Sequence, residues 1–296
     1  MKSPEKNLPY PLDIQLAVDG SEHSVAATSW IADLSLPAGS KVTALGVLAP
    51  RQSPGRAALL AALDEVKVHL LPKGIQVNTG LLHGHPAEAL IDFADEHRPD
   101  LMVVGAKGLH ATLGILLGGV AQQIVEHASW PVAVVRTPYS GLRRVLLATD
   151  GSPNSQSAVE YLAKFPLPDK TEVLVIHVML PPQVPMLPRS GANLDEPEYW
   201  EAYERAPEIQ KKEARAVLSE ALKVLRSSGI RAKSVLASGS VAEEIIQYVD
   251  SQEIDQVVAG SRGLSAVKGW LLGSVSRKLI YHCKCSVLII PDQMGG

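Results

Sequence analysis

The sequence predicts an α/β protein built from two doubly wound parallel sheets, and three observations lead to this prediction. The chain has 296 residues, which suits two domains at ~100–200 residues each. Short apolar runs alternate with segments of helical periodicity, as expected where helices bury both faces of a parallel sheet. Aromatic residues make up 4% of a chain that is 46% hydrophobic, so Val, Leu, Ile and Ala must build the core.

An internal repeat divides the chain. LAVDGS at 16–21 recurs as LATDGS at 147–152, an offset of 131. GHPAEALI at 84–91 recurs as GSVAEEII at 239–246, and VVGAKG at 103–108 resembles VVAGSRG at 257–263 around Gly105 and Gly260, both at an offset of 155. The second copy is therefore longer by 24 residues, the difference between the two offsets.

We expect a tail at residues 1–10, a first domain at 11–138 and a second at 142–293, joined by the linker Pro138-Tyr-Ser-Gly141. The additional residues fall at about 180–206, where five prolines work against regular structure in the first part. A short helix is expected from Glu196 to Arg205. Two interpretations of this insertion stay open: a tolerated surface excursion, or a lid or dimer-contact arm.

Each copy is expected to contain five strands with four helices between them. In the first copy the strands are predicted at Ile14–Val18, Lys41–Leu48, Ile75–Leu82, Leu101–Val104 and Val132–Val135. In the second they are predicted at Arg143–Thr149, Thr171–Met179, Ile230–Ala237, Gln256–Ala259 and Ser286–Ile290. The helices of the second copy are predicted at Asn154–Phe165, Pro207–Ser228, Val241–Ser251 and Ser274–Tyr281.

Charge and cysteine content limit the partners and the compartment. Lys and Arg number 28 against 31 Asp and Glu, a formal charge of -3, so no basic excess favours nucleic acid or an anionic membrane surface. The two cysteines, Cys283 and Cys285, are too close for an ordinary disulfide. With no apolar leader and no long apolar stretch, we expect a cytoplasmic protein.

A glycine-rich pattern in the second copy suggests an anion site. Gly260 ends the fourth strand, Arg262 and Gly263 follow, and Gly273 and Ser274 open a helix after nine further residues. Glycines let backbone N–H groups approach phosphate oxygens, and a helix N-terminus adds its positive dipole end. We expect Ser274 to cap this helix and Arg262 to add charge. The alternative is that the glycines only shape a loop.

The position of this loop favours the ligand interpretation. If the strand order is 3-2-1-4-5, strands one and four are neighbours at the switch point, where ligands bind beyond the carboxyl ends of the strands. Asp150 ends strand one and Gly260 ends strand four, so both would face one crevice. A carboxylate there can accept from an adenine amine or a ribose hydroxyl. The alternative is that Asp150 is only a turn residue.

These motifs resemble the universal stress protein family over nearly the whole chain. The second copy shows LATDGS, HVM, G-SR-G…G-S and HCKCSVLII; the first shows LAVDGS, GHPAEALIDFA, G-AK-G…G-G and HASWPVAVV. The resemblance implies flavodoxin-like, Rossmann-like domains that pair through their last strands as an intramolecular pseudo-dimer. It also implies ATP in the crevice, with Mg²⁺ as an open question.

The resemblance assigns site residues by motif position. In the second copy they are Asp150, Val178, Gly260, Arg262, Gly263, Gly273, Ser274, Val275 and Ser276. In the first copy they are Asp19, Val47, Gly105, Lys107, Gly108, Gly118 and Gly119. There Gly119 replaces a serine or threonine, and Ala121 stands where the second copy has Ser276. Two lost hydroxyls, each worth ~0.5–1.5 kcal/mol as a net hydrogen bond, should weaken the first site.

The resemblance therefore implies a nucleotide-dependent stress-response regulator that binds ATP or another adenine nucleotide mainly in its second domain, and that forms a homodimer. The alternatives are a slow ATP hydrolase or phosphotransfer protein, and a scaffold that needs no nucleotide. No group is committed to positioning water, so at most weak ATPase activity is expected.

Other motifs receive structural interpretations. Ser21 and Ser152 are expected to cap helices, since no base accompanies either as a nucleophile. His83 and His85 lack further ligands for a metal. Cys285 is expected to be a small buried residue. Neither a P-loop nor a dinucleotide fingerprint is present.

Overall fold

The structure is a computed structural model that describes residues 10–49, 55–108, 117–181, 197–263 and 272–291, with the backbone alone for 197–206. The first half contains β1 (Asp13–Ala17), α1 (Glu22–Asp33), β2 (Lys41–Leu48), α2 (Arg56–Leu70), a short 3₁₀ helix (Leu71–Lys73), β3 (Gln76–His83), α3 (Pro86–His97), β4 (Leu101–Gly105), α4 (Gly119–His127) and β5 (Val132–Val135). The second half contains β6 (Arg144–Ala148), α5 (Pro153–Lys164), β7 (Glu172–Met179), α6 (Pro197–Ser227), β8 (Ala232–Ser238), α7 (Val241–Ser251), β9 (Gln256–Gly260), α8 (Ser274–His282) and β10 (Ser286–Ile290).

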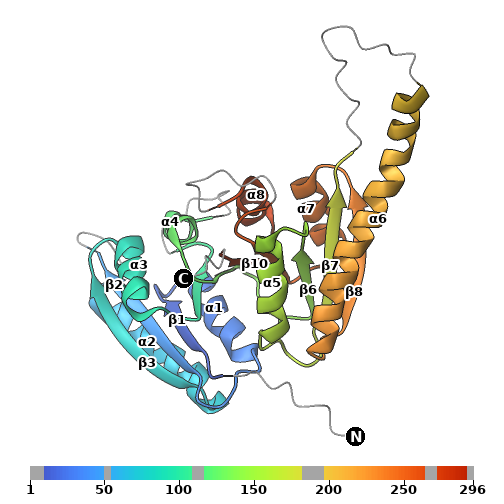
Figure 1. The fold of residues 1–296 in the computed structure, drawn as a ribbon. Coiled ribbons are helices and arrows are strands. Elements are labelled where there is room, and N and C mark those ends of the chain that lie inside the picture. The colour runs from blue at the N-terminus through green and yellow to red at the C-terminus, as the bar shows by residue number, and fades with distance from the viewer. Residues whose placement is uncertain (1–9, 50–54, 109–116, 182–196, 264–271, 292–296) are drawn as a thin grey trace, which may run out of the picture.

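All ten strands belong to one sheet, in the order β3-β2-β1-β4-β5-β10-β9-β6-β7-β8 (Figure 1). Each half therefore has the predicted order 3-2-1-4-5, and every pairing within a half is parallel. The predicted strands agree with the observed ones to within one or two residues. The α/β fold with two flavodoxin-like units is confirmed.

The halves join through their last strands, β5 and β10. These run antiparallel, with Val134 opposite Val287 and Val132 opposite Ile289. The residues of β10 are all buried, as are those of β5, so the junction lies inside the core. This confirms the pairing of the two units as an intramolecular pseudo-dimer.

Helices cover both faces of the sheet and create two apolar layers. The helices α1, α2, α5 and α6 pack on one face, and α3, α4, α7 and α8 pack on the other (Figure 1). Each layer is a single cluster of buried residues that continues from the first half into the second. Because both faces are covered, the strands show continuous apolar runs instead of alternation.

The helix α6 differs from the prediction. The sequence predicts a helix from Pro207 and a short helical extension at Glu196–Arg205, and in the structure the two are one helix that runs unbroken from Pro197 through Pro207 to Ser227. A proline removes one backbone hydrogen bond of a helix, and here the twenty residues that follow pack on β7 and β8 and maintain the helix. The prolines at 182–196 lie outside the described residues.

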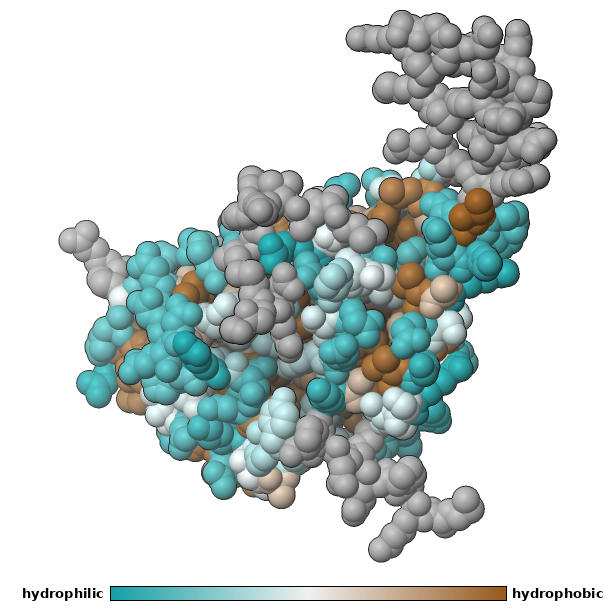
Figure 2. Space-filling view, viewed as in Figure 1, coloured by the Kyte–Doolittle hydropathy of each residue, from teal (hydrophilic) through white to brown (hydrophobic). Residues whose placement is uncertain are grey.

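Figure 1 shows the N-terminal turns of α6 extending past the end of the sheet. Figure 2 shows hydrophobic side chains on the surface that α6 and the end of β7 occupy. Leu180 and Ile209, at 52% and 55% exposure, belong to this region. The side-chain amide of Gln210 donates to the carbonyl oxygen of Leu180 at 3.0 Å. This bond joins α6 to the residue that follows β7.

Candidate functional site

The first component of the candidate site is the Asp-Gly-Ser turn after β6. A carboxylate oxygen of Asp150 accepts from the backbone N–H of Ser152 at 2.9 Å, and Gly151 between them has a φ of +78°. The Ser152 hydroxyl accepts from the N–H of Ser155 at 3.2 Å and caps α5. Ser21 caps α1 in the same way, so both cap predictions are confirmed. The turn thus holds a half-buried carboxylate at the carboxyl end of β6.

The second component is the loop after β9, where two glycines allow close approach. A Cβ atom at Gly260 would lie 2.7 Å from the carbonyl oxygen of Asn154, and one at Gly263 would lie 2.6 Å from Oδ2 of Asp150. Cβ atoms are not found this close to other heavy atoms, so Gly260, which faces backbone atoms, requires glycine, whereas a side chain at Gly263 would have to displace the Asp150 carboxylate. Since β6 and β9 are neighbours, Asp150 and Gly263 meet at one edge, as the strand order predicts.

The third component is the start of α8. The N–H of Gly273 donates to the carbonyl oxygen of Ser261 at 2.7 Å, and a Cβ at Gly273 would lie 3.8 Å from the N atom of Gly263. The backbone of the loop and the first turn of α8 are therefore close together. A helix N-terminus with backbone N–H groups beside it is suited to an anion.

One cap prediction is wrong. The residue with extended dihedrals before α8 is Gly273, at φ -73° and ψ 164°, so Gly273 is the N-cap and Ser274 is already the first helical residue. No side chain accepts a hydrogen bond at this cap, and Ser274 is exposed. Ser274 is therefore accessible at the first turn of α8.

The other predicted residues of the second half support these components. The Ser276 hydroxyl is buried and donates to the carbonyl oxygen of Gly260 at 2.7 Å, so it joins α8 to the end of β9. Val178 is 9% exposed and belongs to the apolar cluster under α7 and α8, against which the half-buried Val275 also packs. Arg262 is half-buried and makes contacts. The loop residues 264–271 lie outside the description.

The first half repeats this backbone geometry closely. A carboxylate oxygen of Asp19 accepts from the N–H of Ser21 at 2.9 Å, and a Cβ at Gly108 would lie 2.6 Å from Oδ2 of Asp19. A Cβ at Gly105 would lie 2.8 Å from the backbone carbon of His23, and the N–H of Gly118 donates to Ala106 at 2.7 Å. In the described parts of these turns and helix starts, the two halves therefore differ in side chains rather than in backbone geometry.

The side-chain differences all affect the crevice of the first half. Ala121 takes the buried position that Ser276 has in the second half. The hydroxyl that joins the helix to the end of the strand is therefore missing. Gly119 is exposed, and a Cβ there would meet no heavy atom within 4 Å. The half-buried Lys107 replaces Arg262, and its carbonyl oxygen accepts from the Ser21 hydroxyl at 3.2 Å. Val47 is half-buried where Val178 is buried.

A polar network beneath the Asp150 turn escaped the sequence analysis. His177 Nδ1 lies 3.0 Å from the carbonyl oxygen of Thr149, and the Thr149 hydroxyl donates to the hydroxyl of Ser155 at 3.1 Å. At the offset of 131 the first half has Val18 and Gly46 in place of Thr149 and His177. Aligning the two copies position by position would have revealed this difference.

His23 is a second residue that sequence reasoning missed. Its Nδ1 accepts from the backbone N–H of Thr137 at 3.2 Å, so it joins the start of α1 to the linker. Burial lowers the pKa of His23 below its ordinary value of 6.5, and the nearby Lys107 and Arg136 act in the same direction. The ring is therefore held in its neutral form.

Lowering the pH is expected to destabilise the protein through His23. The pKa of His23 is lower in the folded than in the unfolded state, so unfolding takes up a proton as the pH falls below 6.5 and the free energy of unfolding decreases. Above pH 6.5 the neutral ring is the main form of His23 in both the folded and the unfolded state, so this loss of stability is absent there. Urea denaturation of the wild type and of His23→Gln at pH 7.5, 6.0 and 5.0 measures it: the variant should lose less stability over this range. Equal losses in the two proteins would show that His23 does not contribute.

Neither the Cys motif nor the His motif lies in surroundings typical of a metal site. Cys283 is fully buried, whereas Cys285 is only half-buried, so the expectation of burial for Cys285 is wrong. The Cys283 side chain and burial raise the pKa of the Cys285 thiol. His83 and His85 are exposed. Within the described parts of the chain, no three His, Cys, Asp or Glu residues gather as metal ligands, and no helix is long and apolar enough to span a membrane.

Comparisons with known proteins bear on both halves. The model of the universal stress protein family matches residues 13–136 and again 141–291. A universal stress protein of Mycolicibacterium smegmatis is 25% identical over 94% of this chain and 96% of its own length, and one of Bacillus subtilis is 29% identical over 50% of this chain and 97% of its own.

Solved structures share the fold. A universal stress protein from Archaeoglobus fulgidus has a TM-score of 0.65 at 20% identity, and covers 98% of this chain and 100% of its own. A functionally unknown protein from Pseudomonas aeruginosa has a TM-score of 0.69 at 14% identity, with 96% of this chain and 94% of its own covered. At these identities the likeness concerns the fold alone.

Proposed function

Because the chain belongs to the universal stress protein family along both of its halves, we propose that it binds an adenine nucleotide, ATP, in the crevice between β6 and β9. We propose further that the bound nucleotide makes it a regulator in the stress response. The observation that carries the proposal is the close approach of Gly263 to Asp150. A Cβ atom added at Gly263 would lie 2.6 Å from Oδ2 of Asp150. This supports the proposal, because a hydrogen-bond acceptor then lies next to backbone N–H groups of the kind that suit an anion.

Each part of the crevice suits one part of the nucleotide. The Asp150 carboxylate can accept from a ribose hydroxyl or the adenine amine. Backbone N–H groups of the loop at Gly263 and of the first turn of α8 suit the phosphates. The exposed Ser274 adds a hydroxyl, and Arg262 adds a positive charge next to the phosphate positions.

Binding is proposed without rapid turnover. Phosphoryl transfer to water requires a group that orients the attacking water, in addition to stabilisation of the developing charge. Arg262 can serve the second purpose, while the Asp150 carboxylate already holds the N–H of Ser152. Measuring ADP release in the presence of Mg²⁺, with Arg262→Ala as the matched variant, separates a binding protein from a slow hydrolase.

We expect one molecule of ATP per chain, because the first half lacks the hydroxyls of Ser274 and Ser276. Isothermal titration of the full chain measures this stoichiometry. The absence of any binding would contradict the proposal, and two equal sites would contradict the asymmetry.

Restoring the hydroxyls is expected to strengthen the first site. A side chain at Gly119→Ser would enter open space. The hydroxyl of Ala121→Ser would donate to the carbonyl oxygen of Gly105, the counterpart of the bond from Ser276 to Gly260. Only the hydroxyl of Gly119→Ser can meet the ligand, and one hydrogen bond at ~0.5–1.5 kcal/mol corresponds to about a 2- to 13-fold gain in affinity, while Ala121→Ser fixes the helix to the strand end. Titration of the double variant should show a second molecule of ATP. A stoichiometry that stays at one at millimolar ATP would show that other differences, such as Lys107, disable the site.

A further inference from the structure

A cavity of about 210 Å³, partly open to solvent, lies where the two halves meet, next to the linker. Its walls come from both halves: Arg136 follows β5, Tyr139 belongs to the linker, Val249 and Ile254 come from α7 and the turn after it, and Lys284 and Cys285 precede β10. Val249 and Ile254 are buried and give the cavity an apolar side, while Cys285 is half-buried.

This cavity is separate from the nucleotide crevice. Cys285 and Asp255 directly precede β10 and β9, so the cavity lies at the amino ends of these strands. The crevice at Asp150 and Gly263 lies at the carboxyl ends of β6 and β9, the opposite edge of the same sheet. A ligand in the cavity would therefore not compete with ATP for space.

The repeat explains why there is a cavity at this place. At the offset of 155, which relates β5 to β10, the counterpart of Cys285 is Trp130, and the counterpart of Val249 is Ala94. Trp130 is 6% exposed and packs in the same apolar layer as Ala94. The second half thus has a thiol in the position of an indole, and the larger side chain of Val249 replaces only part of the lost volume.

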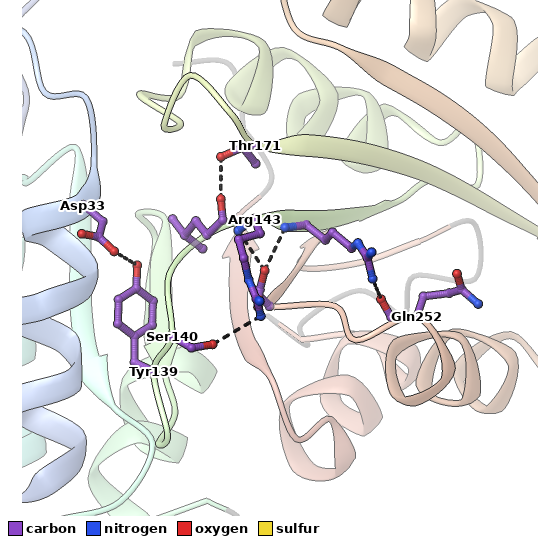
Figure 3. Close-up of polar contacts among 9 residues, drawn as sticks. Asp33, Tyr139, Ser140, Arg143, Thr171 and Gln252 are labelled. Atoms are coloured by element: carbon purple, nitrogen blue, oxygen red, sulfur yellow. Dashed lines mark hydrogen bonds and ion pairs between the residues drawn. The ribbon is translucent and has the colours of Figure 1, made fainter.

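Hydrogen bonds hold the walls of the cavity apart. Figure 3 shows the Tyr139 hydroxyl donating to Asp33, at 2.8 Å. Arg143 pairs with Asp255 at 3.0 Å. The buried Arg136 donates to the carbonyl oxygen of Ile280 and, through its backbone N–H, to the Ser286 hydroxyl at 3.2 Å. At the rim, Lys284 pairs with Asp250 at 2.9 Å. Walls fixed in this way do not collapse into the space that the missing indole leaves.

We propose that this cavity is a second ligand site, which binds a neutral aromatic compound of one or two rings. The missing indole defines the size and the flat shape. The lining carries two basic groups, Arg136 and Lys284, against three acidic ones, Asp250, Glu253 and Asp255. This balance disfavours an anionic ligand, and the apolar wall of Val249 and Ile254 beside polar groups suits the face of an aromatic ring.

The experiment uses indole as the probe with the full-length chain. Indole should raise the melting temperature of the wild type in a saturable manner. Cys285→Trp, which places the side chain of Trp130 in the cavity, should reduce indole affinity at least tenfold, whereas Cys285→Ala should bind indole as the wild type does. Indole-3-carboxylate should bind at least tenfold more weakly than indole. The affinity of the same variants for ATP should be unchanged. Measuring it by titration keeps this test separate from the proposed function.

A second measurement does not depend on how Cys285→Trp folds. In the native wild type, Cys285 is half-buried and Cys283 is fully buried, so a maleimide should modify Cys285 first. Saturating indole should slow this modification at least fivefold. An unchanged rate together with an unchanged melting temperature would overturn the proposal, as would equal indole binding by Cys285→Trp and Cys285→Ala.

Discussion

Gly273→Glu is expected to lower the affinity for ATP at least 100-fold, which corresponds to about 2.7 kcal/mol or more. Gly273 is the N-cap of α8 with ordinary extended dihedrals, so a side chain is compatible with its backbone. A Cβ there would lie 3.3 Å from the Cα of Arg262, a tight contact that small shifts can relieve. The carboxylate would then occupy the positive end of α8 and repel the phosphates.

Gly118→Glu is the matched control, because it makes the same change at the same helix position of the first half. Gly118 is the N-cap of α4, and its N–H donates to Ala106 as that of Gly273 does to Ser261. Isothermal titration should show nearly wild-type affinity for Gly118→Glu. If Gly118→Glu abolished binding and Gly273→Glu did not, the nucleotide would belong to the first half.

Trp30→Ala is expected to destabilise the whole chain by about 4 kcal/mol, within the ~3–5 kcal/mol typical of a buried Trp. Trp30, in α1, is fully buried. Its indole N–H donates to the side-chain oxygen of Gln256, at the start of β9, at 2.7 Å. Its ring lies 5.9 Å from that of Phe165, which follows α5. The variant would therefore lose contacts between the two halves and leave Gln256 without this donor.

Trp30→Phe separates the two contributions, since it retains an aromatic ring and removes only the donor. Urea denaturation followed by circular dichroism should show a smaller loss for Trp30→Phe than for Trp30→Ala. We expect one cooperative transition in the wild type, because both apolar layers cross from one half to the other. A loss below 1 kcal/mol for Trp30→Ala would mean that the halves are stable independently.

The fold was predictable where the local pattern and the global arrangement agree. Strands such as β2, β5 and β10 were predicted to the residue, since a strand buried on both faces is a short apolar run bounded by polar or turn residues. The helix α6 was not, because Pro207 is a local signal for a helix boundary. The packing of the following twenty residues on β7 and β8 outweighed this signal.

The candidate site was predictable in its backbone but not in its supporting contacts. Asp150, Gly263 and Gly273 follow from motif spacing and strand order, and the structure brings them together. The bond from Ser276 to Gly260 and the contact of His177 with Thr149 do not follow, because each joins residues on different elements. Ser274 was assigned as a cap because a Ser beside a helix start usually is one.

The family, the duplication and the side-chain differences between the two copies can be read from the sequence alone. These are properties of motifs and of side-chain identity at matched positions, such as Gly119 and Ala121 against Ser274 and Ser276. Three features could be found only in the folded molecule: the bond from Ser276 to Gly260, the contact of His177 with Thr149, and the cavity beside Cys285, at the position that Trp130 occupies in the first half. The reason is physical: packing depends on which surfaces meet, and residues far apart along the chain build those surfaces together.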